Sequence, residues 1–85
     1  MFRKIWQAEY LGNRIRIENS WSGEKLYVND LLQDEQIGIG IRSRLYGKLK
    51  GADGIPVDIR VSLGSFLTVD CRLFVDNTPI VLLRA

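Results

Sequence analysis

Residues 57–63 read Val-Asp-Ile-Arg-Val-Ser-Leu, so that every second residue is apolar and those between are polar or charged. Successive side chains of a β-strand point to opposite faces, and this alternation therefore predicts a strand with one buried and one solvated face. Residues 14–18 repeat the pattern with two isoleucines between two arginines and a glutamate. Because no stretch spaces its apolar residues as a helix does, these patterns predict an all-β fold.

Turn residues interrupt the alternation about every 8 to 12 residues, as in sandwiches and barrels. No helix is available to connect parallel strands, so the sheets are expected to be antiparallel. We expect one domain over residues 1–85, a small antiparallel β-sandwich or partly open barrel of seven to eight strands. The predicted turns are Gly12-Asn13, Ser22-Gly23, Asn29-Asp30, Gly64-Ser65 and Asp76-Asn77, with a polar loop over residues 51–54.

Two stretches of the sequence allow more specific structural predictions. Apolar residues of one parity run from Ile37 through Ile39 and Ile41 to Leu49, which predicts a long, bent strand. Glycines along it, among them Gly47, predict bends, bulges or close backbone approach. The last segment, residues 79–83, is apolar on both parities. It is expected to be a central strand covered on both sides or a strand buried against another subunit.

Composition narrows the class of protein. The chain has a net charge of +2, no histidine and one cysteine, which leaves no intrachain disulfide and removes the commonest zinc ligand. A domain of this size is often reinforced by disulfides, metals or oligomerisation, so self-association is the expected support. Charges within the first residues and the absence of a long apolar run predict a cytoplasmic chain that contacts no membrane.

No residue pattern indicates catalysis. Five acids, Glu24, Asp30, Asp34, Glu35 and Asp58, fall in predicted turns or on outward positions and are interpreted as solvated surface groups. Cys71 shares the parity of apolar neighbours and is expected to be a core residue rather than a nucleophile. No serine lies in a hydrolase motif. We therefore expect a protein that is not an enzyme and uses no metal or cofactor.

The cationic residues support a binding hypothesis. Cations and aromatic side chains on a β-face bind single-stranded nucleic acid in oligonucleotide-binding barrels. The alternative, preferred on sequence alone, is that they are the ordinary solvated residues of half-buried strands, diluted by neighbouring acids. The residues on predicted outward positions are Arg14, Arg16, Arg42, Arg44, Tyr46, Lys48, Arg60 and Arg72.

Four large apolar residues are candidates for an interface. Trp6 and Trp21 are expected in the core or at an oligomer contact, because large aromatic residues in small domains usually serve there. Ile80 and Leu82 belong to the apolar last segment and are candidates for contact with a partner or a second copy.

The order of several segments resembles a known family. Residues 24–30, 45–49 and 73–77 follow a scheme of strand, Val-(Asp/Asn)-Gly-like turn and strand. In this respect the chain resembles the β-sandwich domains of Fas apoptotic inhibitory molecule, although Asn29-Asp30 and Asp76-Asn77 lack the family's glycine. The resemblance implies a compact sandwich that works through protein contacts, and it transfers no functional residue.

The leading hypothesis from sequence is thus a non-enzymatic protein-interaction or assembly module with a protein partner or self-association. The alternative is an oligonucleotide- or polyanion-binding barrel. Absent catalytic groups and surplus apolar strand surface favour the first, and the outward arginines favour the second.

Overall fold

The computed structural model describes residues 3–38, 42–65 and 69–85, and for residues 42, 65 and 69 only the backbone. These residues form nine strands and no helix. The strands are β1 (Arg3–Tyr10), β2 (Asn13–Ser20), β3 (Gly23–Val28), β4 (Leu31–Ile37), β5 (Arg42–Lys50), β6 (Pro56–Ser65), β7 (Val69–Val75), β8 (Thr78–Ile80) and β9 (Leu83–Arg84).

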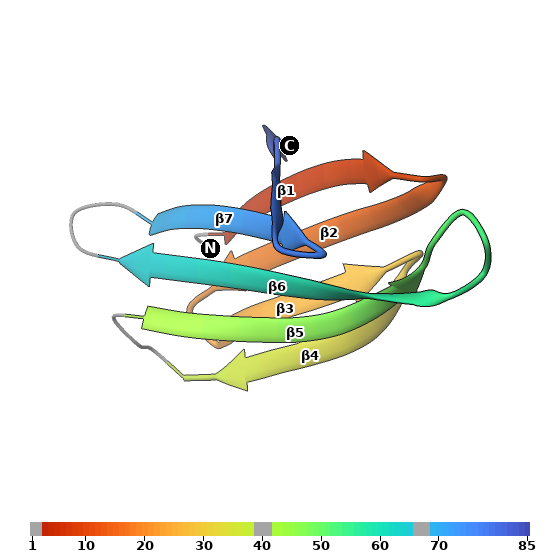
Figure 1. Cartoon of the computed structure of the whole chain (residues 1–85). Coiled ribbons are helices and arrows are strands. Elements are labelled where there is room, and N and C mark those ends of the chain that lie inside the picture. The colour runs from red at the N-terminus through yellow and green to blue at the C-terminus, as the bar shows by residue number, and fades with distance from the viewer. Residues whose placement is uncertain (1–2, 39–41, 66–68) are drawn as a thin grey trace.

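The strands form two antiparallel sheets packed face to face. Sheet A has the order β4-β3-β2-β1-β9, and sheet B has the order β5-β6-β7-β8. Figure 1 shows β5, β6 and β7 together in one layer and β1, β2 and β3 in the other. The expected antiparallel sandwich is confirmed. Its strand number exceeds seven or eight because the apolar C-terminal segment is divided between the sheets.

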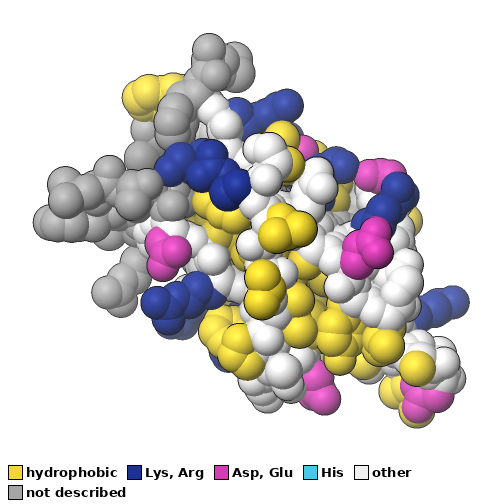
Figure 2. All heavy atoms as spheres, turned by 90° about the horizontal axis from the view of Figure 1, so that it is seen from above, with side chains coloured by type: hydrophobic (Ala, Val, Ile, Leu, Met, Phe, Trp, Pro, Cys, Tyr) yellow, Lys and Arg dark blue, Asp and Glu magenta, His cyan; other side chains and the backbone are white. Residues whose placement is uncertain are grey.

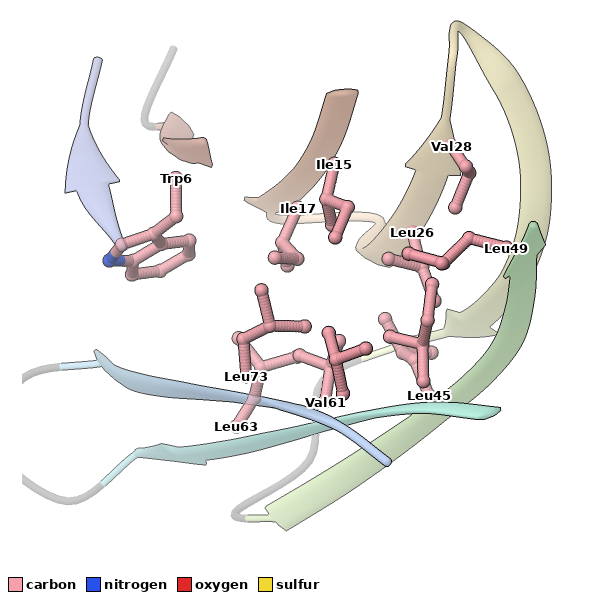
Figure 3. Close-up of a cluster of buried hydrophobic side chains, with 12 residues drawn as sticks. Trp6, Ile15, Ile17, Leu26, Val28, Leu45, Leu49, Val61, Leu63 and Leu73 are labelled. Atoms are coloured by element: carbon pink, nitrogen blue, oxygen red, sulfur yellow. The ribbon is translucent and has the colours of Figure 1, made fainter. Parts of the chain in front are cut away.

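The core is built from the inward parity of both sheets. Side chains from sheet A, such as Ile15 and Leu26, point toward side chains from sheet B, such as Leu45 and Val61, and Trp6 closes one side of the cluster (Figure 3). Ile17, Leu26, Val61 and Val75 are fully buried. The alternating strands therefore bury their apolar residues as the sequence predicts. In this arrangement the apolar face of sheet A packs against the apolar face of sheet B.

The long strand expected over residues 37–49 does not form. β4 belongs to sheet A and β5 to sheet B, so the chain changes sheets between them. Ile37 is 77 % exposed, whereas Leu45 and Leu49 are buried as expected. Gly40, Ile39 and Ile41 lie outside the described residues. The prediction was wrong because unbroken parity is equally compatible with two strands separated by a turn of the chain.

The last segment is also divided. Residues 78–80 pair with β7 in sheet B, and Leu83 and Arg84 pair with β1 in sheet A. Val81 is 82 % and Leu83 69 % exposed, while Ile80 and Leu82 are half-buried against the core. The segment is therefore neither a single strand nor covered on both sides, because its crossing between sheets leaves alternate side chains outside.

Three hairpins use two-residue turns with both central residues at positive φ, the geometry of type I′ turns. Asn29-Asp30 and Asp76-Asn77 confirm their predicted positions, since both residue types tolerate this backbone. The first turn is Leu11-Gly12, one residue earlier than predicted, because Asn13 pairs with Tyr10 as the first residue of β2.

The other two predicted turns are displaced. Trp21 and Ser22 form the second turn and Gly23 begins β3, while Gly64 and Ser65 still belong to β6. Residues 66–68, which follow β6, lie outside the described part of the chain.

Side chains of β4 join the adjacent edges of the two sheets. The backbone N–H groups of Tyr46 and Lys48 donate to Asp34 Oδ2 at 2.8 Å and Gln33 Oε1 at 3.3 Å. Gly47 lies between them, and a Cβ there would come within 3.2 Å of Leu26 Cδ2 and 3.1 Å of Gln33 Cβ. The expected close approach at Gly47 is thus observed, and it lets β4 satisfy edge donors of β5.

Buried Asn13 also joins the two sheets, at the last residue of β5. Its Nδ2 donates to the carbonyl oxygens of Tyr10, Leu11 and Lys50, the last at 3.0 Å, and its Oδ1 accepts from Asn29 Nδ2 at 3.1 Å. Lys50 ends β5, so one side chain connects the β1–β2 and β3–β4 turns of sheet A with sheet B.

The backbone geometry at Gly23 generates a testable prediction. Gly23 has φ +136°, and a Cβ there would clash with the carbonyl oxygen of Gln36. We expect Gly23→Ala to lower the free energy of unfolding by about 3 kcal/mol. Gly64→Ala is the control: no atom lies within 4 Å of its Cβ position. This control should raise stability by about 0.5 to 1 kcal/mol. Urea denaturation measures both, and equal midpoints would contradict the geometry.

Candidate polyanion-binding face

The solvent side of sheet B collects many of the predicted cationic residues. In β5, β6 and β7 the odd-numbered residues from Leu45 to Val75 face the core, so the even-numbered ones point outward. We call the outward positions of these three strands the sheet B face. Its charged and aromatic members among the described side chains are Arg44, Tyr46, Lys48, Lys50, Asp58, Arg60, Asp70, Arg72 and Phe74.

The strand register arranges this face in transverse rows. One row runs from Tyr46 through Arg60 and Phe74 to Pro79, since each residue is paired with the next across the strands. The neighbouring row, two residues along the strands, places Arg44 and Arg72 on either side of Ser62. On the other side of the aromatic row, Lys48 pairs with Asp58. The aromatic row is therefore flanked by two arginines on one side and by the Lys48–Asp58 pair on the other.

The face carries more positive charge than the whole chain. Five cations and two acids occupy its described positions, a net charge of +3 against +2 for the complete sequence. Asp58 and Asp70 lie 3.4 Å from Lys48 Nζ and 3.6 Å from Arg72 Nε, in exposed ion pairs. Among the described residues no carboxylate lies within 4 Å of the exposed Arg44 or Arg60. Exposed pairs are weak, so a ligand phosphate competes readily for the paired cations as well.

Aromatic groups interleave with these charges. Tyr46 is 55 % exposed, and Arg60 Cζ lies 4.5 Å from the ring centroid of half-buried Phe74. A shallow hollow of about 490 Å³ opens beside Tyr46 and is lined also by Lys48, Asp58, Arg60 and Asn77.

The other predicted cations lie elsewhere. Arg14 and Arg16 are on the outer face of sheet A, where both contact Asp30 at 2.8 and 2.9 Å, and Arg16 Nε also lies 3.0 Å from Glu18. The Asn29-Asp30 turn brings this carboxylate beside β2, so these arginines have acidic partners at shorter distances than the ion pairs of the sheet B face. Arg42 begins β5, but its side chain lies outside the described residues. The sheet B face thus gathers Arg44, Tyr46, Lys48, Arg60 and Arg72.

The four interface candidates differ in how much of each side chain is exposed to solvent. Trp6 is 6 % exposed and belongs to the core, with Arg84 Cζ 5.6 Å from its ring. Ile80 and Leu82 are half-buried against that core. Trp21, at 68 % exposed in the second turn, presents most of its surface to solvent. Only Trp21 of the four offers a largely exposed apolar side chain.

Sequence reasoning missed Phe74 and Lys50 as members of the face. The parity of Phe74 relative to Leu73 and Val75 was a usable signal, because it places this aromatic side chain on the outward face of an alternating strand. Its place in a row with Arg60 and Tyr46 follows only from the strand register.

The candidate acids do not form a common site. Glu24 is 6 % exposed, with Oε1 3.4 Å from Asn19 Nδ2, so its interpretation as a solvated acid was wrong. Glu24 shares the inward parity of Leu26 and faces the core from the beginning of β3. Among the described side chains no three Cys, Asp or Glu residues are placed to hold a metal ion. Within residues 3–38, 42–65 and 69–85, no helix has the length and apolarity needed to cross a membrane.

Cys71 lies on the inward parity of β7, beside the core as expected, and is half-buried. Burial, with a smaller contribution from the negative charge of Asp70, raises the pKa of the Cys71 thiol from 9.0 to about 12. Because the folded pKa is the higher one, the neutral thiol's contribution to stability is complete below pH 9 and is lost as the pH rises toward 12.

The raised pKa predicts an unreactive cysteine. At pH 9 about half of the unfolded thiols are ionised, but only about one in a thousand of the folded ones. We expect iodoacetamide to modify Cys71 at least about a hundredfold more slowly in the native protein than in urea. Mass spectrometry of timed samples measures both rates, and similar rates would contradict the burial of this thiol.

Neither a protein family, nor a curated protein, nor a solved structure matches this chain. The resemblance to Fas apoptotic inhibitory molecule therefore stays a sequence-based expectation, and the sheet B face is interpreted from its own chemistry.

Proposed function

We propose that this chain is a non-enzymatic module that binds polyanionic ligands such as nucleic acid on the sheet B face. Cations arranged along a solvated sheet attract a phosphate backbone and release its condensed counterions, which is the main source of affinity for such ligands. The proposed function requires the protein to be located where nucleic acid is present. A cytoplasmic location would meet this requirement.

The observation that carries this proposal is the segregation of charge between the two sheets. The described side chains of the sheet B face carry a net charge of +3, and among the residues that the structure describes no carboxylate lies within 4 Å of Arg44 or Arg60. Arg3, Arg14 and Arg16 on sheet A, in contrast, each contact an acid. The net charge of the whole chain does not reveal this difference, because residues outside the sheet B face offset part of its positive charge.

Removing the two arginines that flank the aromatic row tests the proposal. We expect the double variant Arg44→Gln/Arg72→Gln to bind a fluorescein-labelled single strand of about 12 nucleotides more weakly than wild type. The slope of log affinity against log salt concentration should fall by about 1.4, or 0.7 for each lost phosphate contact. Fluorescence anisotropy titrations at several salt concentrations measure both quantities.

The matched control is Arg3→Gln/Arg14→Gln, which removes the same charge from the outer face of sheet A. Its affinity and salt slope should stay close to those of wild type. Equal losses in the two double variants would mean that net charge rather than the sheet B face determines binding. Absence of measurable binding by the wild type at low salt would overturn the proposal.

A second candidate function is the protein-interaction or self-association role expected from the sequence. The observation that favours it is the apolar segment that crosses between the sheets, where Val81 is 82 % and Leu83 69 % exposed. Figure 2 shows hydrophobic side chains gathered in the middle of the molecule as seen from above, with charged groups around them. A second copy of the chain is the occupant we propose, in line with the reinforcement that small domains often need.

Sedimentation equilibrium over a wide range of protein concentrations tests self-association. A dimer that dissociates in Leu83→Asp but persists in Leu31→Asp would support contact through the crossing segment, because both leucines are similarly exposed at 69 and 68 %. A monomer at every concentration would remove this candidate without affecting polyanion binding.

A further inference from the structure

We infer that the ligand of the sheet B face is an extended single strand of nucleic acid whose bases stack across the row Tyr46–Arg60–Phe74. The inference rests on the proposed function, because it names the class of polyanion that this face selects. It depends on three observations: the alignment of the row, the cations on both sides of it and the character of the hollow beside Tyr46.

The row offers two planar surfaces at neighbouring positions. Tyr46 is directly opposite Arg60, and Arg60 is directly opposite Phe74. Adjacent strands lie about 4.8 Å apart, so the two aromatic residues are about 10 Å apart across the sheet. The Arg60 guanidinium lies over the Phe74 ring, with 4.5 Å between Cζ and the ring centroid. The exposed Tyr46 ring and the stacked Arg60–Phe74 pair can each receive a base, since every base has a π-face and stacks on aromatic or guanidinium planes.

Cations flank this row where a backbone would run. Side chains two residues apart on one face of a strand are separated by about 6.6 Å, so Arg44 and Arg72 lie one such step to one side and Lys48 one step to the other. A strand that crosses the sheet with its bases on the row therefore has its phosphates within reach of these side chains. Arginine and lysine contacts to phosphate then hold the strand without reading its sequence.

The hollow beside Tyr46 offers groups that a base can use. Asp58 and Asn77 line it together with Lys48 and Arg60, so it presents hydrogen-bond acceptors as well as cations. Asn77 adds an exposed amide with a donor and an acceptor. A base edge can donate to the Asp58 carboxylate and pair with the Asn77 amide, whereas a phosphate polymer has no donor for Asp58.

The alternative polyanions cannot use the aromatic row. A duplex keeps its bases within its own stack, so a flat sheet meets only its phosphates unless the bases are unpaired. A backbone without bases has nothing to stack. Both would depend on the cations alone, and both would bind a variant that lacks the Tyr46 ring as well as they bind the wild type.

Fluorescence anisotropy with three labelled probes tests the inference. The probes are a mixed-sequence single strand of about 12 nucleotides, the same length of abasic phosphodiester backbone, and the corresponding duplex. We expect the single strand to bind at least about tenfold more tightly than the abasic backbone, since each stacked base contributes about 1 to 3 kcal/mol. Tyr46→Leu and Phe74→Leu should each reduce affinity for the single strand by about five- to tenfold and leave the abasic probe unchanged.

Two control variants accompany these. Tyr46→Phe keeps the ring and should keep the affinity of the wild type. Tyr27→Leu removes a tyrosine from the outer face of sheet A, where Arg16 Cζ lies 4.3 Å from its ring, and should not change binding. Circular dichroism of Tyr46→Leu verifies folding, which is expected because Tyr46 is exposed.

The outcomes separate this inference from the proposed function. Loss of single-strand affinity in Tyr46→Leu with retained abasic binding supports base stacking. Equal, salt-dependent binding of all three probes leaves polyanion binding in place and overturns the stacking inference. No binding of any probe overturns both.

Discussion

The pairing register of β5, β6 and β7 is the constraint on which the rest of the structure depends. Because Leu45 is opposite Val61 and Val61 is opposite Leu73, the three strands present their apolar residues to the same side. Burial of that side against Ile15, Ile17 and Leu26 of sheet A supplies the main driving force for folding. A shift of one residue in any of these strands would turn its apolar set to solvent, so the core specifies the register strongly.

The same strand register also aligns the outward residues that form the candidate site. Residues that alternate with the core positions are aligned as strictly as the core positions themselves, which places Tyr46, Arg60 and Phe74 in one line and Arg44 and Arg72 in the next. The rigidity of the row follows from the packing beneath it, since the inward neighbours on each strand are almost fully buried. A binding surface on the solvent side of a sandwich is in this sense held in place by the core.

Local hydrogen bonding decides how the two sheets meet and how their charges differ. Asp34 and Gln33 of β4 satisfy two backbone donors of β5, and Asn13 donates to the carbonyl oxygen of Lys50 at the end of the same strand, so this part of the β5 edge is occupied. On sheet A the Asn29-Asp30 turn delivers a carboxylate to Arg14 and Arg16. No turn does so for Arg44 or Arg60 among the described residues. Two faces with similar numbers of arginines thereby acquire different charge.

The sequence by itself determined the fold class, the inward parity of most strands and the turns at Asn29-Asp30 and Asp76-Asn77, because alternation and turn chemistry act over a few residues and are local. It indicated five residues of the sheet B face for the same reason, each being polar or aromatic at an outward position. Only the tertiary structure decided that β4 and β5 belong to different sheets, that the C-terminal segment crosses between them and that Glu24 is buried. It also separated Arg14 and Arg16 from the other cations and added Phe74 to the row. These outcomes depend on which strands pair and in what register, a long-range choice made by burying two apolar faces together, and no periodicity along the chain encodes it.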